Sequence, residues 1–205
     1  MIVVIDYGAG NIGSILNMLK RLGAQAQASS DPRIIEQASK LILPGVGSFD
    51  FGMSKLIESG VIAILNQKVL VEKTPILGIC LGVQLMTNGS EEGILPGLGW
   101  FNATTVKFDL KNEDSRLKIP HMGWNDTFIK KDSKFFNKGD DEYRYYYVHS
   151  YHLVAEDKTD ILTTCKYGYE FVSGLERDNI TGLQFHPEKS HKFGIRILKN
   201  FIENI

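Results

Sequence analysis

One of the two cysteines in this chain lies in a pattern that suits a nucleophile. Cys80 stands in GICLGVQ, residues 78–84, with a glycine two positions away on either side. The preceding TPILGI is typical of a buried strand and the following LGVQLMT of the start of a helix. Glycines allow two backbone segments to approach where a Cβ would clash. The pattern predicts a nucleophile elbow, G-x-C-x-G, although a buried cysteine at a glycine-rich strand end fits it as well.

An elbow would have consequences for the chemistry of the sulfur. It would direct the sulfur of Cys80 out of the top of the sheet, and the helix N-terminus would favour the thiolate. A thiolate that attacks an acyl group also needs backbone N–H groups for the oxyanion. The elbow offers the N–H of Leu81. A second strand end, PGVG at 44–47, could offer Val46 and Gly47, although an ordinary strand-to-helix turn fits those residues too.

A general base is the next requirement, and five histidines are candidates: His121, His149, His152, His186 and His191. Only His186 directly follows a strand-like stretch, NITGLQF, and reactive groups gather where strands of an α/β sheet end. Glu188 lies two residues on, and residues i and i+2 of an extended segment point the same way. Glu188 could then accept the second ring N–H and fix the tautomer. Alone, H-x-E also fits a surface turn; with the cysteine elbow it indicates a Cys-His-Glu triad.

The elements that position these residues alternate between strand and helix over the first hundred residues. Strands are expected at IVVID, KLILPG and TPILGI, and helices at NIGSILNMLKRLG, after the Asp-Pro pair at 31–32, and at SFDFGMSKLIESG and VIAILNQKVLVEK. This alternation predicts a mostly parallel central sheet flanked by helices.

From residue 100 onward the pattern changes. Short β-rich pieces predict additional antiparallel strands in the C-terminal half, at WFNATTVKFDL, YRYYYVHSYHL, DILTTCKYG, YEFVSGLERD and NITGLQFH. LKNEDSRLK is expected to be a surface loop, and SHKFGIRILKNFIENI an amphipathic closing helix.

Composition narrows the classes of function. The net charge of −1 over 205 residues gives no electrostatic case for nucleic acid or an anionic membrane. There is no apolar run of 18 residues, and Asp6 comes too early for a signal peptide. Two distant cysteines fit a reducing compartment, so a cytoplasmic protein is expected, with Cys165 buried in a strand. Without repeats or linkers, residues 1–205 are expected to form a single domain.

Several motifs together resemble one family. GICLGVQL with QFHPEKS resembles the class I (triad) glutamine amidotransferases, in the order Cys, His, Glu. DYGAGNIGS, LPGVGSF, PHMGWN, YYVHSYH and FHPEKSHKFG are similar to the glutaminase subunits of imidazole glycerol phosphate synthase, over essentially the whole chain. The resemblance implies that Cys80 forms a glutamyl thioester and releases ammonia. His186 would be the general base and acid, Glu188 the orienting carboxylate, and no metal or cofactor is implied.

The same resemblance implies a binding site for L-glutamine. Gln84 matches a side chain that contacts glutamine, and Glu92 matches an acidic residue that binds the α-ammonium group. The backbone of Ser150 and Tyr151 matches a segment that lines the glutamine site. Gly45 belongs to the PGVG stretch, which matches an oxyanion strand whose productive conformation in the family depends on the partner enzyme. Without the resemblance, Glu92 would be interpreted as a solvated loop charge.

A partner is implied as well, in a heterodimer with a (β/α)8-barrel cyclase or synthase subunit. Ammonia would travel through it to a nucleotide-derived substrate, giving imidazole glycerol phosphate and an aminoimidazole carboxamide ribotide in histidine biosynthesis. The positions that match the family's subunit interface are Asn11, Trp124, Tyr146 and Lys189. A lone tryptophan is also usual in a core, and a lysine at position 189 would also be usual on a surface.

One stretch leaves the acceptor of the ammonia open. GVGSFDFGMSKL departs from the form of the histidine-pathway subunit, which has a Gly-Asp-Ala run after the Phe. It is similar to paralogues of surface-polysaccharide clusters, where a similar pair supplies ammonia for sugar amidation. A cysteine peptidase on a similar fold is a more distant alternative. A binding subunit with a vestigial site is another, although the intact triad argues against it.

Overall fold

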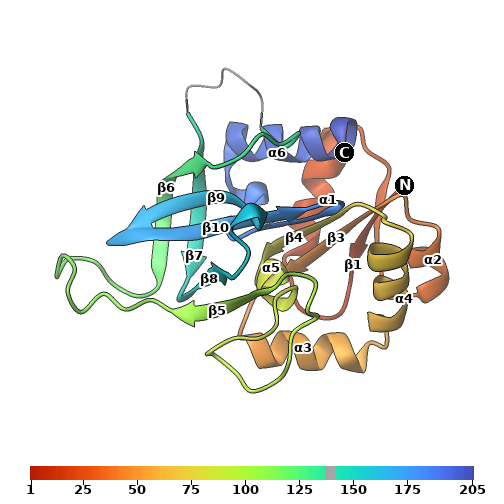
Figure 1. Ribbon diagram of the computed structural model, residues 1–205. Coiled ribbons are helices and arrows are strands. Elements are labelled where there is room, and N and C mark those ends of the chain that lie inside the picture. The colour runs from red at the N-terminus through yellow and green to blue at the C-terminus, as the bar shows by residue number, and fades with distance from the viewer. Residues whose placement is uncertain (137–141) are drawn as a thin grey trace.

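The computed structural model describes residues 1–136 and 142–205. Its strands are β1 (Ile2–Ile5), β2 (Ala26–Ser29), β3 (Lys40–Gly45), β4 (Ile76–Cys80), β5 (Ala103–Lys107), β6 (His121–Ile129), β7 (Arg144–His149), β8 (Tyr151–Ala155), β9 (Ile161–Tyr167), β10 (Tyr169–Arg177) and β11 (Ile180–Leu183). Its helices are α1 (Ile12–Arg21), α2 (Pro32–Glu36), α3 (Phe49–Glu58), α4 (Ile62–Asn66), α5 (Leu81–Leu85) and α6 (His191–Asn204). A π-helical turn, Gln67–Val71, extends α4. Figure 1 shows this arrangement.

The strands form one large sheet in the order β2-β1-β3-β4-β11-β10-β9-β6-β7, with β5 and β8 attached beside β10. Strands β2, β1, β3, β4 and β11 pair in parallel. From β11 outward, β10, β9, β6 and β7 pair antiparallel. The predicted fold class, a parallel sheet with antiparallel strands added in the C-terminal half, is confirmed.

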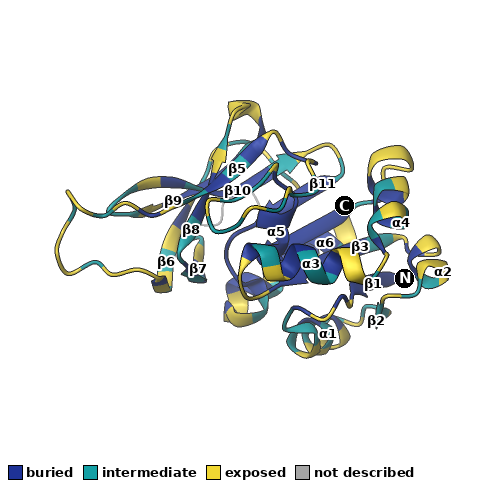
Figure 2. Cartoon of the chain, turned by 90° about the horizontal axis from the view of Figure 1, so that it is seen from below, coloured by how far each residue is buried: buried dark blue, intermediate teal, exposed yellow. Residues whose placement is uncertain are grey.

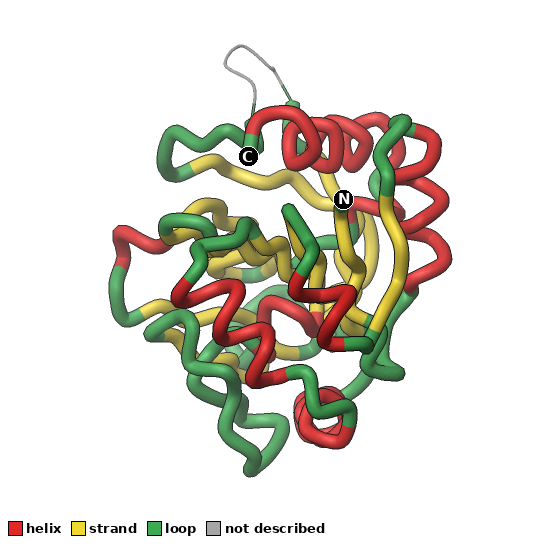
Figure 3. The backbone as a smooth tube through the Cα atoms, turned by 90° about the vertical axis from the view of Figure 1, so that its right-hand side faces the viewer, coloured by secondary structure: helices red, strands yellow, loops and turns green. Residues whose placement is uncertain are grey.

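Helices cover both faces of the parallel strands (Figures 1 and 3). Side chains of β1 alternate between them: Val3 and Ile5 join the core with α2, α3 and α4, whereas Ile2 and Val4 join the core with α1 and α6. All four residues are buried, which explains why the strand is an unbroken apolar run rather than an alternating one. Figure 2 shows this buried centre in dark blue.

The sequence did not predict two of the strands, and it merged two others. β2 is only four residues of small and polar side chains, AQAS, and β6 carries polar residues and a glycine in HMGWNDTFI. Neither stretch has the apolar run or strict alternation that indicates a strand. The single piece expected at YRYYYVHSYHL is divided at Ser150 into β7 and β8. Residues 110–118 form the mostly exposed loop that was expected.

Helix α6 crosses the turn that follows β11 at very close range. A Cβ added at Gly194 would stand 1.7 Å from the carbonyl oxygen of Pro187, so only glycine allows this approach. The turn at Pro187 separates His186 from Glu188, so the packing of α6 supports both side chains. Among the described residues, no helix is long and apolar enough to cross a membrane.

We expect Gly194→Ala to lower the free energy of unfolding by about 3 kcal/mol, because the methyl group must displace backbone rather than a flexible side chain. Gly13 provides a matched control, since it is also a helical glycine and a Cβ there would meet nothing within 4 Å. Gly13→Ala should raise the free energy of unfolding by about 0.5–1 kcal/mol. Urea denaturation of both variants measures the contrast, and equal stabilities would contradict it.

Candidate active site

Cys80 lies at the sharp turn that its flanking glycines predict. It is the last residue of β4, directly before α5, and its backbone has φ +54° and ψ −112°. A non-glycine residue with positive φ is strained, and such strain persists only where the surroundings enforce it. Here a Cβ at Gly82 would stand 1.9 Å from the carbonyl oxygen of Leu43, and one at Gly78 would stand 2.8 Å from the side chain of Met86. The glycines therefore let α5 pack directly on the strand ends.

His186 reaches the same edge of the sheet because β11 pairs in parallel with β4. Its Nδ1 atom lies 2.8 Å from Oε1 of Glu188, and both side chains are about 98–99% buried. Pro187–Lys189 form a 3₁₀ turn, so the two side chains meet through a tight turn and not through the extended backbone that was expected. The backbone N–H of His186 donates to the carbonyl of Tyr146 on β7, and this bond fixes the backbone from which the imidazole ring extends.

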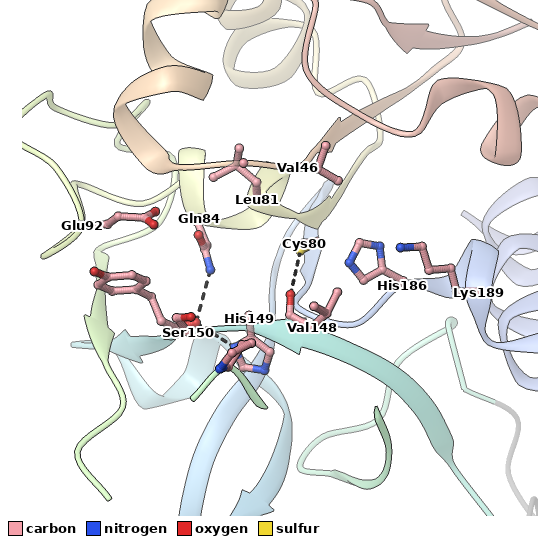
Figure 4. Close-up of a pocket in the computed structure, with 13 residues that line it drawn as sticks. Val46, Cys80, Leu81, Gln84, Glu92, Val148, His149, Ser150, His186 and Lys189 are labelled. Atoms are coloured by element: carbon pink, nitrogen blue, oxygen red, sulfur yellow. Dashed lines mark hydrogen bonds between the residues drawn. The ribbon is translucent and has the colours of Figure 1, made fainter. Parts of the chain in front are cut away.

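The electrostatics of this group favour a charged imidazole. Burial lowers the pKa of His186, but Cys80 and the Glu188 carboxylate outweigh burial and raise that pKa to about 10. Within the described part of the chain, Nε2 of His186 is a buried nitrogen without a hydrogen-bond partner. With Nδ1 held by Glu188, Nε2 is therefore the atom left to exchange a proton with the sulfur or with a substrate. Figure 4 shows the ring beside Cys80.

These residues open onto a cavity of about 330 Å³ (Figure 4). It is lined by Val46, Gly47, Cys80, Leu81, Gln84, Glu92, Pro120, Val148, His149, Ser150, Tyr151, His186 and Lys189. The cavity lining thus contains every residue that was expected to act as nucleophile or base, to bind the oxyanion or to bind glutamine, except Gly45. The orienting carboxylate, Glu188, does not line the cavity either. Glu188 holds the histidine ring, and Gly45 pairs with Cys80 in the β3–β4 register.

The loop after β3 is held at both ends and exposed between them. Before it, the hydroxyl of Tyr7 donates to the carbonyl of Pro44 at 2.7 Å. After it, Oε2 of Glu92 accepts from the backbone N–H of Phe49 at 2.8 Å and so caps the start of α3. Residues 46–48 between these anchors are exposed, and Gly47 has φ +106°. Glu92 therefore has a structural bond that the sequence did not predict, in addition to its place in the cavity.

Gln84 is held by two acceptors. Its Nε2 atom donates to the carbonyl of Tyr151 at 3.3 Å and to Oε1 of Gln184 at 3.0 Å. Both N–H bonds of the amide are thus engaged inside the protein, so the amide oxygen is the atom that Gln84 can offer to a ligand. Sequence reasoning missed Gln184, although it lies within QFHPEKS. A glutamine in an otherwise apolar strand end, ITGLQF, was the available signal.

A pair of buried histidines lies beside the cavity, and one of them, His149, lines it. Nδ1 of His121 lies 3.0 Å from Nε2 of His149, whose own Nδ1 lies 2.8 Å from the carbonyl of Tyr151. Burial lowers the pKa of His121 to about 4 and that of His149 to about 3. Both rings are therefore neutral at pH 7. All four of their ring nitrogens have partners inside the protein, so neither ring has a nitrogen left for a substrate, although both were candidates for the base. They support the backbone that lines the cavity.

Three of the four positions expected at a subunit interface lie together. Trp124 on β6 and Tyr146 on β7 are 6.4 Å apart between ring centroids, and Nζ of Lys189 lies 5.8 Å from the Tyr146 ring. Trp124 is 36% exposed, so it is not a core residue. Asn11 directly precedes α1, the helix that also lies against the Pro187–Lys189 turn.

Comparisons with known proteins agree with this geometry. A model of the glutamine amidotransferase class-I family matches residues 3–205. A crystal structure of a glutamine amidotransferase superposes with a TM-score of 0.73 at 18% identity, covering 98% of this chain and 97% of that one. The structure of PurLQS from Thermotoga maritima gives 0.71 at 18% identity, covering 98% and 94%. These two share the fold, and with the family match the chain belongs to the class-I glutamine amidotransferases.

Curated relatives narrow the family further. Imidazole glycerol phosphate synthase subunit HisH 2 of Methanococcus maripaludis is 56% identical over 203 residues, and that of Pseudomonas aeruginosa is 50% identical over 203 residues, with 99% of each chain covered in both cases. The HisH subunit of Leptospira borgpetersenii is 41% identical over 201 residues, 98% of each chain. Within its family the chain groups with the HisH subunits of imidazole glycerol phosphate synthase, which confirms the resemblance of its motifs.

The buried histidines predict a pH dependence of stability. Between pH 6.5 and about 4, His121 takes up a proton in the unfolded chain but not in the folded one, so stability falls as the pH falls through this range. His121→Asn keeps an N–H donor near the Nδ1 position and cannot be protonated. The loss of unfolding free energy between pH 7 and pH 5 should then be smaller by roughly 1–2 kcal/mol than in the unsubstituted chain. Urea denaturation at both pH values measures this, and an unchanged loss would contradict it.

Proposed function

We propose that this chain hydrolyses L-glutamine to glutamate and ammonia with Cys80, His186 and Glu188 as its catalytic triad. It is the glutaminase subunit that supplies ammonia to a synthase subunit, which makes imidazole glycerol phosphate and aminoimidazole carboxamide ribotide in histidine biosynthesis. The observation that carries the triad is the meeting of a strained cysteine and a carboxylate-bound histidine at one edge of the sheet, on a cavity of about 330 Å³. The names of the curated relatives support the acceptor pathway.

The first half of the reaction forms a thioester. The Cys80 thiolate attacks the carboxamide carbon of glutamine, and the developing oxyanion is stabilised by backbone N–H groups. Leu81, the residue after the nucleophile, supplies one of these, and the exposed loop with Val46 and Gly47 supplies the other. The His186 imidazolium gives its Nε2 proton to the leaving nitrogen, which departs as ammonia.

The second half returns the enzyme to its starting state. Neutral His186 takes a proton from water, the resulting hydroxide attacks the thioester carbon, and glutamate leaves while the thiolate is restored. Throughout the cycle, Glu188 accepts a hydrogen bond from the Nδ1–H of His186. This bond fixes the orientation of the ring and stabilises the imidazolium. No other group is needed to balance the protons over the cycle.

The glutamine site follows from the polarity of the cavity wall. The Glu92 carboxylate lies in the cavity and would pair with the substrate's α-ammonium group, while the Gln84 amide oxygen would accept an N–H. Ser150 and Tyr151 also line the cavity, at the break between β7 and β8, and their backbone is proposed to contact the substrate. Gly45 keeps the oxyanion loop close to the nucleophile by pairing with it across the strands.

The partner is proposed to be a (β/α)8-barrel subunit in a heterodimer. Trp124, Tyr146 and Lys189 form an aromatic and cationic group beside the cavity, which Lys189 lines, and Asn11 is proposed to extend the contact toward the loop after β3. We assign residues 1–205 to a single glutaminase domain in the cytoplasm, acting without nucleic acid or membrane. Supply of ammonia for sugar amidation is the alternative acceptor pathway, and the names of the relatives favour histidine biosynthesis over it.

Replacement of the nucleophile tests the proposal. Cys80→Ala should reduce glutamate release from glutamine by more than about 10⁴-fold, because no thioester can form. The folded structure should persist, since alanine is smaller than cysteine at the same turn. The assay is glutamate release by the purified chain with its synthase partner, alongside a peptide substrate. Retained glutamate release, or peptide cleavage in place of it, would contradict the proposal. A separate assay, in which ammonia is supplied in the medium and the products are analysed, identifies the acceptor.

A second prediction separates the two roles of Glu92. Glu92→Gln keeps an oxygen that can accept from Phe49 N–H but removes the charge, so we expect KM for glutamine to rise about tenfold or more with little change in kcat. Glu92→Leu also removes the cap of α3 and should additionally lower the free energy of unfolding by about 1 kcal/mol. A sharp fall in kcat with unchanged KM in Glu92→Gln would show a catalytic role instead.

A further inference from the structure

Gln184 places a neutral amide against the sulfur of the nucleophile. It directly follows β11, two residues before His186, and is fully buried. Its Nε2 atom lies 3.8 Å from Sγ of Cys80, within reach of a hydrogen bond to sulfur. Its backbone N–H donates to the carbonyl of Ser173 at 2.9 Å, so the residue is fixed at both ends.

The two ends of an amide have the same shape, so which end faces the sulfur must be decided by its partners. Gln84 decides it. A backbone carbonyl can only accept, so the Gln84 atom that meets the Tyr151 carbonyl at 3.3 Å must be the nitrogen. That same nitrogen meets Gln184 at 3.0 Å, so Gln184 must present its oxygen there. Its NH₂ group therefore faces Cys80.

The Tyr151 carbonyl is held in turn by the buried histidines. It accepts from Nδ1 of His149 at 2.8 Å, which leaves Nε2 of that ring to accept from Nδ1 of His121 at 3.0 Å. Nε2 of His121 then accepts from Nδ2 of Asn125 at 3.2 Å. Nδ2 of Asn125 also donates to the carbonyl of Lys166 at 2.9 Å. This second carbonyl, at the other end of the network, requires the same donor and acceptor assignment. Two backbone carbonyls thus fix the direction of every bond in the network.

The other groups around the Cys80 sulfur show why an N–H donor from Gln184 would matter. The His186 imidazolium is the cationic partner, Glu188 stands behind it, and the Tyr7 hydroxyl interacts with Cys80 from the segment after β1. From β7, the carbonyl of Val148 can accept from a thiol at 4.0 Å but would repel a thiolate. The neighbouring His149 is neutral and buried. When His186 gives its proton to the leaving group, Gln184 remains as an N–H donor to sulfur.

We propose that Gln184 is a catalytic residue that stabilises the Cys80 thiolate through its side-chain N–H. Gln84, the Tyr151 carbonyl, His149, His121 and Asn125 act as positioning groups that hold this amide in the donating orientation. The inference rests on the proposed function for its role in turnover, but its direct test is the reactivity of the thiol, which needs neither glutamine nor a partner subunit.

The test compares Gln184→Met with the unsubstituted chain, because methionine is unbranched and of similar length but cannot donate. The rate of Cys80 alkylation by iodoacetamide is followed from pH 5 to 10 by mass spectrometry. A hydrogen bond to a charged group is worth about tenfold or more in an equilibrium. The alkylation rate at pH 7 should fall by about that factor, the rise with pH should move to higher pH, and kcat for glutamine should fall more than KM changes.

Asn200→Leu serves as the matched control, since it removes a different buried amide, one that donates to the carbonyl of Phe135 at 2.9 Å. It should leave the alkylation profile of Cys80 unchanged. If Gln184→Met does not fold, the NMR signals of the Gln184 side-chain NH₂ group in the unsubstituted chain replace it, and they should shift when Cys80 is alkylated. An unchanged alkylation profile in Gln184→Met, or NH₂ signals unaffected by alkylation, would overturn the proposal. If the chain failed to release glutamate but Gln184→Met still changed alkylation, only the proposed function would be wrong.

Discussion

The parallel pairing of β4 between β3 and β11 is the constraint on which the whole site depends. Parallel neighbouring strands end at the same edge of a sheet. The main-chain hydrogen bonds of β3, β4 and β11 therefore bring the nucleophile, the oxyanion loop and the triad histidine together without help from side-chain contacts. Register completes the arrangement, because Gly45 stands directly beside Cys80. The nucleophile and the triad histidine are thereby placed at the ends of two strands, β4 and β11, whose residues are all buried.

Close packing at this edge of the sheet holds Cys80 in a strained backbone conformation. The left-handed backbone of Cys80 persists because α5 lies against Leu43 with only a glycine between them. The antiparallel half adds the second wall, since the break at Ser150 ends β7 where the cavity begins. Behind that wall, the neutral histidine pair supports the Tyr151 carbonyl, so the antiparallel strands contribute polarity as well as shape. The network ends at Asn125, next to the exposed Trp124 on the same strand.

Short-range pattern predicted the parts of the site that depend on local backbone. The elbow around Cys80 and the strand that leads to His186 follow from glycine and apolar spacing, and the structure contains both of them. The 3₁₀ turn between His186 and Glu188 was not predicted, because its shape is imposed by α6 packing on Pro187. The roles of Gln184 and of the histidine pair were not predicted for a similar reason. Gln184 lies 104 residues from Cys80 in sequence and the two histidines lie 28 residues apart, so local pattern does not encode either contact.

The role of Cys80 as the nucleophile toward glutamine can be measured by labelling with a glutamine-like electrophile such as 6-diazo-5-oxonorleucine, followed by peptide mass spectrometry. The chain offers its own internal comparison, because Cys165 is fully buried in β9 and burial raises the pKa of its thiol to about 12. We expect one covalent adduct, on Cys80, with loss of glutaminase activity in step with labelling and protection by excess glutamine. An adduct on Cys165, or full loss of activity without modification of Cys80, would contradict it.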